Sequence, residues 1–93
     1  MFRFRKSVPL SYDQQAYIYY FSRLYKQHRE SDQAFIRKLC RKAGGPHWKA
    51  VLAYVSGKMS INAACTYYYI SPSTLDRAAR QYYREFGIAW EKI

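Results

Sequence analysis

The stretch that decides the fold reads SINAACTYYYISPSTLDRAARQYYREF over residues 60–86. Ser60 precedes a short segment rich in small and apolar residues, and Ser71, followed by Pro72, precedes a longer one. Serine is favoured as the residue that caps the start of a helix, and proline fits the first helical turn. The pattern predicts one helix over about 61–68 and a second over about 72–86, with only two or three residues between them.

Two helices joined by so short a turn are typical of the DNA-binding helix-turn-helix. Residues 61–80 resemble that superfamily, in particular the homeodomain-like type of transposases, resolvases and small bacterial or phage regulators. The resemblance rests on Cys65, at a position that needs a small side chain, and on apolar residues where two steeply crossing helices interlock: Ala64, Tyr68, Ile70, Leu75 and Ala78. The alternative is a plain pair of antiparallel helices without a DNA-binding role.

The sequence departs from this family at the turn, where Tyr69 stands at the position usually taken by glycine. Glycine is common there because the backbone is left-handed. We therefore expect either a turn of a different shape or a tyrosine that tolerates the strain.

The second helix of the motif has two different faces. Helical spacing puts Leu75, Ala79, Tyr82 and Phe86 on the core side and Ser73, Arg77, Arg80 and Arg84 on the opposite side. The resemblance implies that Ser71, Pro72, Ser73, Asp76, Arg77 and Arg80 face DNA. Arginine can bond both acceptors of a guanine edge, and Asp76 can accept from cytosine or orient an arginine. We predict base contacts from Ser73, Asp76, Arg77 and Arg80, and backbone contacts from Ser71, Thr74 and Arg84; the alternative for each arginine is a solvated surface charge.

Upstream of the motif, three further helices are predicted. The first spans about 12–29, begins with a capping box at Ser11 and Gln14, and has the apolar stripe Tyr17, Phe21, Leu24 and His28. The second spans about 32–43, ends at Gly44-Gly45, and has the stripe Phe35, Ile36, Leu39, Cys40 and Ala43. The third starts at Pro46, ends at Gly57, and has the stripe Trp48, Val51, Leu52 and Val55.

Downstream, Gly87 is expected to stop the last helix, and residues 88–93 to form a tail that folds back through Ile88 and Trp90. The prediction is one all-α domain over residues 1–93, with about five short helices and a C-terminal helix-turn-helix over 60–86.

The charge of the chain favours a polyanionic partner. Sixteen Lys and Arg against six Asp and Glu give +10 at pH 7. Residues 1–59 hold twelve of these cations and three of the acids, so the motif itself carries only +1. We expect most phosphate contacts from a basic arm over residues 1–10, through Arg3, Arg5 and Lys6, and from Arg37, Lys38, Arg41 and Lys42 on the second helix. The arm either lies along a minor groove or is a solvated terminus.

Several classes of protein are excluded by what the sequence lacks. Cys40 and Cys65 are too few for a disulfide framework or a four-ligand zinc site, and His28 and His47 have no metal-ligand spacing. There is no nucleophile with a base, no pair of carboxylates and no phosphate-binding glycine loop. We expect no enzyme, no metal and no cofactor. Apolar stretches are too short for a membrane helix, and the N-terminus does not read as a signal peptide, so we expect a cytoplasmic, nucleoid-associated protein without a membrane partner.

Two functional hypotheses remain. The first is a small sequence-specific transcriptional regulator of phage or mobile-element origin that binds double-stranded DNA. The alternative is a protein-interaction adaptor in a transcription or recombination complex. A homodimer and a contact with RNA polymerase are both left open. The eleven tyrosines do not by themselves indicate a stacking platform for single strands, because Tyr17, Tyr68 and Tyr82 fall on apolar stripes. Tyr19, Tyr67 and Tyr69 are left for a surface role, such as a contact with a second protein.

Overall fold

The computed structural model describes residues 2–91, and in this range every regular element is a helix. The elements are α1 (Tyr12–Arg23), the 3-10 turn η1 (Tyr25–Gln27), α2 (Glu30–Gly44), the 3-10 turn η2 (Gly45–His47), α3 (Trp48–Val55), α4 (Ile61–Tyr68) and α5 (Pro72–Glu91). The predicted all-α class, with a helix-turn-helix as its last two helices, is confirmed.

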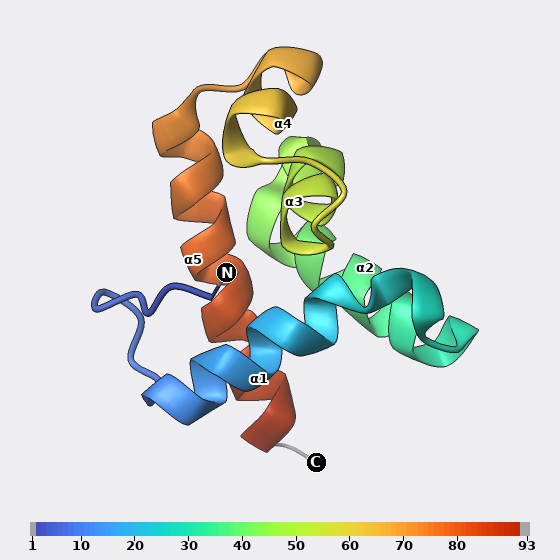
Figure 1. The fold of residues 1–93 in the computed structure, drawn as a ribbon, viewed down its shortest axis with the longest axis vertical. Coiled ribbons are helices and arrows are strands. Elements are labelled where there is room, and N and C mark those ends of the chain that lie inside the picture. Colours follow the sequence, from blue (N-terminus) through green and yellow to red (C-terminus); the bar gives the residue numbers. More distant parts are fainter. Residues whose placement is uncertain (1, 92–93) are drawn as a thin grey trace.

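The long helix α5 organises the molecule. It packs along α2 and also contacts α1, α3 and α4 (Figure 1). The centre of the core is formed by side chains with no exposed surface from four helices: Ile18 of α1, Ile36 of α2, Val51 of α3, and Leu75 and Tyr82 of α5. The apolar stripes predicted for α2 and α5 are the ones that face this core.

Helix α1 begins as predicted but ends six residues early. Ser11 and Gln14 form the capping box, whereas Leu24 leaves the helical conformation and η1 follows. Side chains bond the carbonyl groups near this end: His28 Nε2 lies 2.7 Å from the Phe21 oxygen, and Gln33 Nε2 donates to the Tyr25 oxygen at 2.9 Å. The prediction that the helix runs to residue 29 is wrong. Side chains that follow α1 bond the carbonyl groups at its end, in place of N–H groups of a further helical turn.

The core side of α1 is also not the predicted stripe. Gln15, Ile18 and Ser22 are buried, whereas Tyr17 and Leu24 are about half exposed. The buried polar groups are satisfied, which removes the cost of desolvating them. Ser22 donates to the Ile18 carbonyl, and its oxygen lies 2.6 Å from the Tyr82 hydroxyl. Hydrophobic spacing alone could not predict this face.

Helix α2 has its predicted core residues, but its ends differ slightly from the prediction. It starts at Glu30 after Arg29, which makes no side-chain cap, so that Ser31 and Asp32 lie in its first turn. Pro46 belongs to η2, and α3 starts at Trp48 instead of at the proline. Of the stripe predicted for α3, Val51 and Val55 are buried and Trp48 and Leu52 are partly buried.

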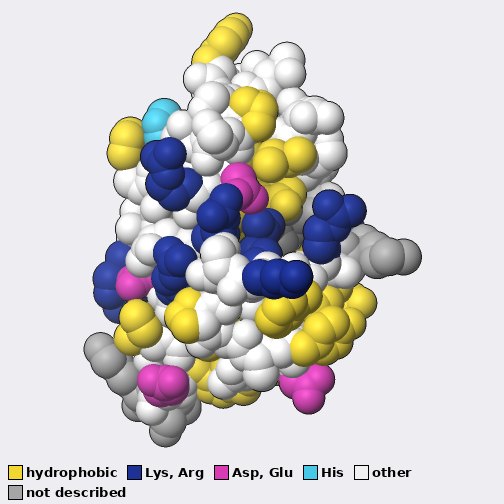
Figure 2. Space-filling model, turned by 90° about the vertical axis from the view of Figure 1, so that its left-hand side faces the viewer, with side chains coloured by type: hydrophobic (Ala, Val, Ile, Leu, Met, Phe, Trp, Pro, Cys, Tyr) yellow, Lys and Arg dark blue, Asp and Glu magenta, His cyan; other side chains and the backbone are white. Residues whose placement is uncertain are grey.

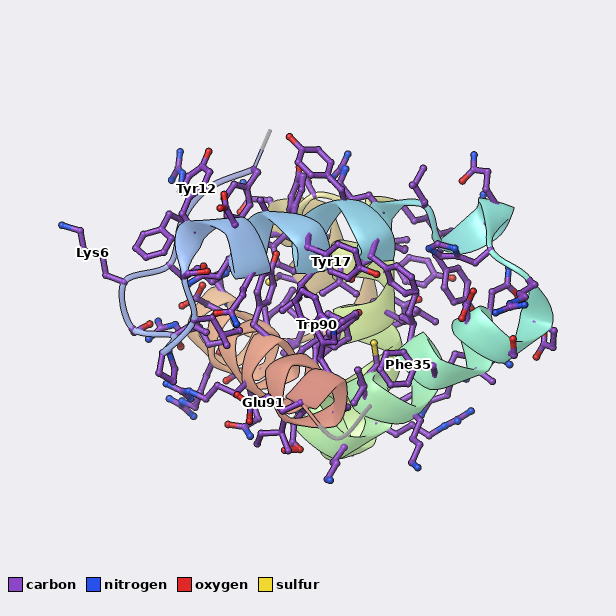
Figure 3. The ribbon with its side chains drawn as sticks, turned by 90° about the horizontal axis from the view of Figure 1, so that it is seen from below. Lys6, Tyr12, Tyr17, Phe35, Trp90 and Glu91 are labelled. Atoms are coloured by element: carbon purple, nitrogen blue, oxygen red, sulfur yellow. The ribbon has the colours of Figure 1, made fainter. Side chains whose placement is uncertain are left out.

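The predicted stop at Gly87 is wrong, because α5 continues through this residue to Glu91. A Cβ atom at Gly87 would lie 2.9 Å from Cδ2 of Leu10, which is closer than packed carbon atoms come. The glycine therefore serves the close approach of the N-terminal segment to α5. The part of the predicted tail that the structure describes is helical: Trp90 stacks on Tyr17 with ring centroids 4.7 Å apart, while Ile88 is 47% exposed (Figure 3). Residues 92 and 93 of the predicted tail lie outside the described residues.

Within residues 2–91, no helix combines the length and the apolarity needed to cross a membrane.

Candidate nucleic-acid interface

The two helices of the helix-turn-helix begin where their capping residues predicted. The Ser60 oxygen accepts a hydrogen bond from the Ala63 N–H at 3.1 Å, and α4 spans Ile61–Tyr68. The Ser71 oxygen accepts from the Thr74 N–H at 3.2 Å, and α5 begins at Pro72. Ala64 and Leu75 are fully buried where the two helices cross, as the interlocking pattern requires.

The turn between these helices has the left-handed residue that glycine usually provides. Tyr69 has φ 54° and ψ 49°, and among residues 2–91 it is the one non-glycine residue with a positive φ. The N–H groups of Tyr69 and Ile70 both bond the Cys65 carbonyl, the second at 3.1 Å. Tyr69 is 94% exposed, so its ring contributes no packing. The structure thus selects the second of the two expectations: an ordinary turn, in which the tyrosine carries the strain.

The outer face of α5 presents the predicted polar residues. Ser73 and Arg77 are exposed, and the Arg80 side chain is 40% exposed. Arg84 lies further along the same helix and donates to the Ser7 carbonyl at 3.0 Å. This face looks out on the side of the molecule where Lys and Arg side chains gather in a band over the arm and α5 (Figure 2).

Asp76 joins the outer face of α5 to the N-terminal arm. Its Oδ1 atom accepts from Nη1 of Arg5 at 2.8 Å, and its Oδ2 atom accepts from Nε and Nη2 of Arg80, the former at 2.8 Å. Burial on its own would raise the pKa of Asp76, but the hydrogen bonds from Arg80 and Arg5 outweigh it and hold this pKa below its ordinary value. Of the two roles expected for Asp76, this geometry fits the orientation of an arginine.

The arm is packed on the body, which neither expected alternative anticipated. The buried Gln15 side chain accepts from the Arg5 N–H at 2.8 Å and donates to the carbonyls of Arg5 and Leu10 at 3.0 and 3.1 Å. Val8 is only 2% exposed. Residues 5–10 therefore form an ordered strap beside α5 (Figure 1). Arg3 and Lys6 are exposed, and Lys6 points away from the body (Figure 3).

The Arg5 guanidinium is largely covered, with 19% of its side chain exposed. Besides Asp76 it contacts the Tyr54 hydroxyl at 3.1 Å and lies 5.5 Å from the centre of the Tyr83 ring. Burial alone would lower the pKa of Arg5, but the hydrogen bond to Asp76 and the two tyrosines raise it above its ordinary value. Arg5 can therefore meet a phosphate only from one side, while Asp76 holds the other.

The four cations predicted on α2 have different neighbours. Arg37 bonds Glu30 at 2.5 Å and the Tyr25 hydroxyl at 2.8 Å, and Arg41 lies 4.4 Å from the centre of the Trp48 ring. Lys42 is the member that approaches α5, at 3.5 Å from the Glu85 carboxylate. Lys38 is exposed. The structure thus places Lys42 beside the motif and directs Arg37 and Arg41 towards other groups.

A small basic cavity beside the motif was missed by the sequence reasoning. It has a volume of about 260 Å³ and combines three arginines with three tyrosines at the N-terminus of α4; its lining includes Arg3, Arg5, Arg23, Tyr19, Tyr54 and Tyr83. Burial raises the pKa of Tyr83 to about 12, so this hydroxyl stays protonated at neutral pH. Cations, hydroxyls and a helix N-terminus all favour an anion such as a backbone phosphate. No local signal could have found the cavity, because its residues come from the arm, α1, α3, α4 and α5.

Comparison with known proteins agrees with this geometry. Residues 49–85, which are less than half of the chain, match the family model of the helix-turn-helix, Psq domain. No curated protein and no solved structure matches the chain. The matched segment runs from Lys49 in α3, through α4 and the turn, to Glu85 in α5. Residues 49–85 therefore form a helix-turn-helix that is similar to the Psq domain, a homeodomain-like family of DNA-binding domains.

Proposed function

We propose that this protein is a small transcriptional regulator that recognises a specific sequence in double-stranded DNA through α5. The observation that carries the proposal is the pair Arg77 and Arg80 on the outer face of the second motif helix, one exposed and the other held by Asp76. In helix-turn-helix proteins the N-terminal residues of the recognition helix reach base edges in the major groove. An arginine held in one orientation also loses less side-chain entropy when it bonds a base.

The remaining polar groups are arranged to hold the backbone. Ser71, Thr74 and the arginine-lined cavity at the start of α4 flank the exposed face of α5, and Arg84 and the arm extend it. Backbone contacts of this kind fix the register of a protein on the duplex without reading its sequence. Ser73, at the start of α5, is the further base contact in this proposal.

The wider setting is part of the same proposal. A phage or mobile-element source, a nucleoid-associated location in the cytoplasm and a non-enzymatic role all follow from the regulator hypothesis. Support for the last comes from the acidic residues: four of the six are in ion pairs with lysine or arginine, which leaves little for acid–base chemistry.

The test is sequence discrimination by Arg77. A preferred site is first selected from random duplexes, and Arg77→Ala is then compared with the wild type on that site and on random DNA. The variant should lose about 1–3 kcal/mol of binding free energy on the preferred site and much less on random duplex. A bidentate arginine–guanine contact contributes about this much discrimination between bases.

The matched control is Arg29→Ala, which removes the same charge from a side chain that is 80% exposed and lies outside the motif. It should leave discrimination unchanged. If no sequence is enriched by the selection, or if Arg77→Ala weakens both duplexes equally, the regulator proposal fails and a non-specific binder remains.

One observation favours the adaptor as a second candidate. Tyr67 and Tyr69 are 65% and 94% exposed at the end of α4, and exposed tyrosines are enriched in protein interfaces. Under this alternative, replacing both residues (Tyr67→Ser with Tyr69→Ser) abolishes binding to the partner protein of the transcription or recombination complex and leaves duplex binding intact.

A further inference from the structure

A second concave surface lies away from the outer face of α5. It has a volume of about 490 Å³ and is formed by the end of α1, η1, α3, the turn over residues 56–58 and Tyr68 of α4. None of its lining residues belongs to α5. The groove is therefore built from residues other than those of α5 that the proposed function places in a major groove.

The groove is strongly basic. Its lining contains Arg23, Lys26, Lys49 and Lys58 and no acidic residue. The ion-paired carboxylates of the described chain are committed elsewhere, to Arg5, Arg29, Arg37, Lys42 and Arg80. Among residues 2–91, none of the four groove cations is in an ion pair. A concave surface with cations of one sign concentrates a polyanion.

Aromatic rings are interleaved with these cations. Tyr25, Trp48 and Tyr68 line the groove, and all three are partly exposed. The Trp48 ring also has Arg41 at 4.4 Å and Lys49 at 5.8 Å from its centre. Rings that alternate with cations are the arrangement by which proteins stack unpaired bases and hold the adjoining phosphates. In a duplex the base faces are covered by neighbouring pairs and cannot reach such rings.

Arg23 connects this groove with the arginine cavity beside the arm. It lines both surfaces, and its guanidinium lies across Gly57, where an added Cβ atom would come within 2.8 Å of Cζ. Gly57 has φ 77°, a left-handed conformation that glycine adopts readily. The turn is therefore shaped so that a cation bridges the two basic surfaces.

We propose that the groove of Arg23, Lys26, Trp48, Lys49, Lys58 and Tyr68 binds a short unpaired segment of nucleic acid. The rings stack its bases and the cations hold its phosphates, while α5 engages duplex DNA on another face. An acidic peptide would satisfy the cations but would leave the rings without a stacking partner, so charge and aromatic content together favour the single strand. This inference is independent of sequence reading by α5.

The test uses Trp48 as the reporter. The chain has two tryptophans, and Trp90→Phe leaves Trp48 alone. Octathymidylate added to this variant should quench Trp48 emission saturably, with an affinity that falls as salt rises. Lys49→Gln with Lys58→Gln should weaken this binding by about tenfold, because two phosphate contacts are lost. The control, Arg29→Gln, removes one charge from an exposed side chain outside both the groove and the expected DNA contacts, and should change the affinity less than about twofold.

Three results would overturn the inference: no quenching by octathymidylate, an equal loss of affinity per charge removed in Arg29→Gln and in the groove lysines, or polyglutamate binding as tightly as octathymidylate with the same dependence on Lys49 and Lys58. The last result would assign the groove to an acidic peptide. Arg77→Ala separates this test from the proposed function, because it should impair the preferred duplex and leave octathymidylate binding unchanged. If sequence discrimination fails but octathymidylate still quenches Trp48, the regulator proposal is wrong and the single-strand proposal for the groove stands.

Discussion

Tyr69 holds a conformation that costs most residues free energy. A left-handed backbone costs about 1–2 kcal/mol for a residue with a Cβ atom, and the exposed Tyr69 ring returns no packing energy. We expect Tyr69→Gly to raise the free energy of unfolding by roughly 0.5 to 1 kcal/mol, since the greater freedom of glycine in the unfolded chain offsets part of the relief. Denaturant unfolding measures this change. Tyr67→Gly is the control, and it should destabilise the protein because Tyr67 lies inside α4. A clear loss of stability in Tyr69→Gly would contradict the strain argument.

Asp76 makes a pH-dependent contribution to stability. Its pKa is lowered in the folded state, so its contribution is complete above the unfolded value, near pH 4, and is lost as pH falls through the lower folded value. Asp76→Asn should lower stability by roughly 1 kcal/mol at pH 7, a modest amount because the pair is partly solvated. The difference in melting temperature between wild type and variant should stay constant above about pH 5 and disappear as the pH falls through the lowered folded-state pKa of Asp76. A gap that persists under acid conditions would mean that shape, and not charge, makes Asp76 stabilising.

At the level of elements, the starts of α1, α4 and α5 were predictable from their capping residues, whereas the ends of α1 and α5 were not. Ser60 and Ser71 each accept a bond from an N–H three residues away. The residue that predicts the helix start and the bond that forms it therefore lie in the same short stretch of sequence. The end of α1 is bonded by side chains that follow the helix, and the course of α5 through Gly87 depends on a residue distant in sequence, so capping signals alone predicted neither. At Gly87 the deciding contact comes from Leu10.

The candidate site divides in the same way. Helical spacing alone placed Arg77 on the outer face of α5, where the structure has it. The bond between Arg5 and Asp76 joins residues 71 positions apart, and no pattern within either segment announces it. The burial of Gln15 follows from the arm that it bonds, so its polar character misled the stripe prediction.

Helices α2 and α5 should affect DNA binding in different ways. Replacing Arg41 and Lys42 by Ala should weaken preferred and random duplex alike and reduce the salt slope by roughly one unit per charge, because phosphate contacts carry no sequence information. Replacing Arg77 and Arg80 should remove the preference first. Titrations of both duplexes at several salt concentrations measure the two effects. Equal losses on both duplexes for all four residues would show that α5 holds DNA without reading it.

For the whole molecule, the positive charge sets the salt dependence of binding. With a net charge of +10, and with about five to seven phosphates neutralised, the logarithm of duplex affinity should fall against the logarithm of salt with a slope of roughly −4 to −6. Residues 1–59 supply most of this charge. Substitutions in α5 that remove the preference for one DNA sequence should therefore leave this slope nearly unchanged. A slope near zero would leave the adaptor as the surviving hypothesis.

Helix α5 runs unbroken through Gly87, so a tilt at one end of this rigid helix displaces its other end. Its 20 residues span about 30 Å, with the exposed Arg77 towards one end and Trp90 at the other. A tilt of about 5° around its first turn moves the far end by roughly 2 to 3 Å. That displacement is about half of the 4.7 Å that separates the ring centroids of Trp90 and Tyr17. If the fit of α5 in a groove tilts the helix, the change should be detectable in the emission of Trp90, at the other end of α5.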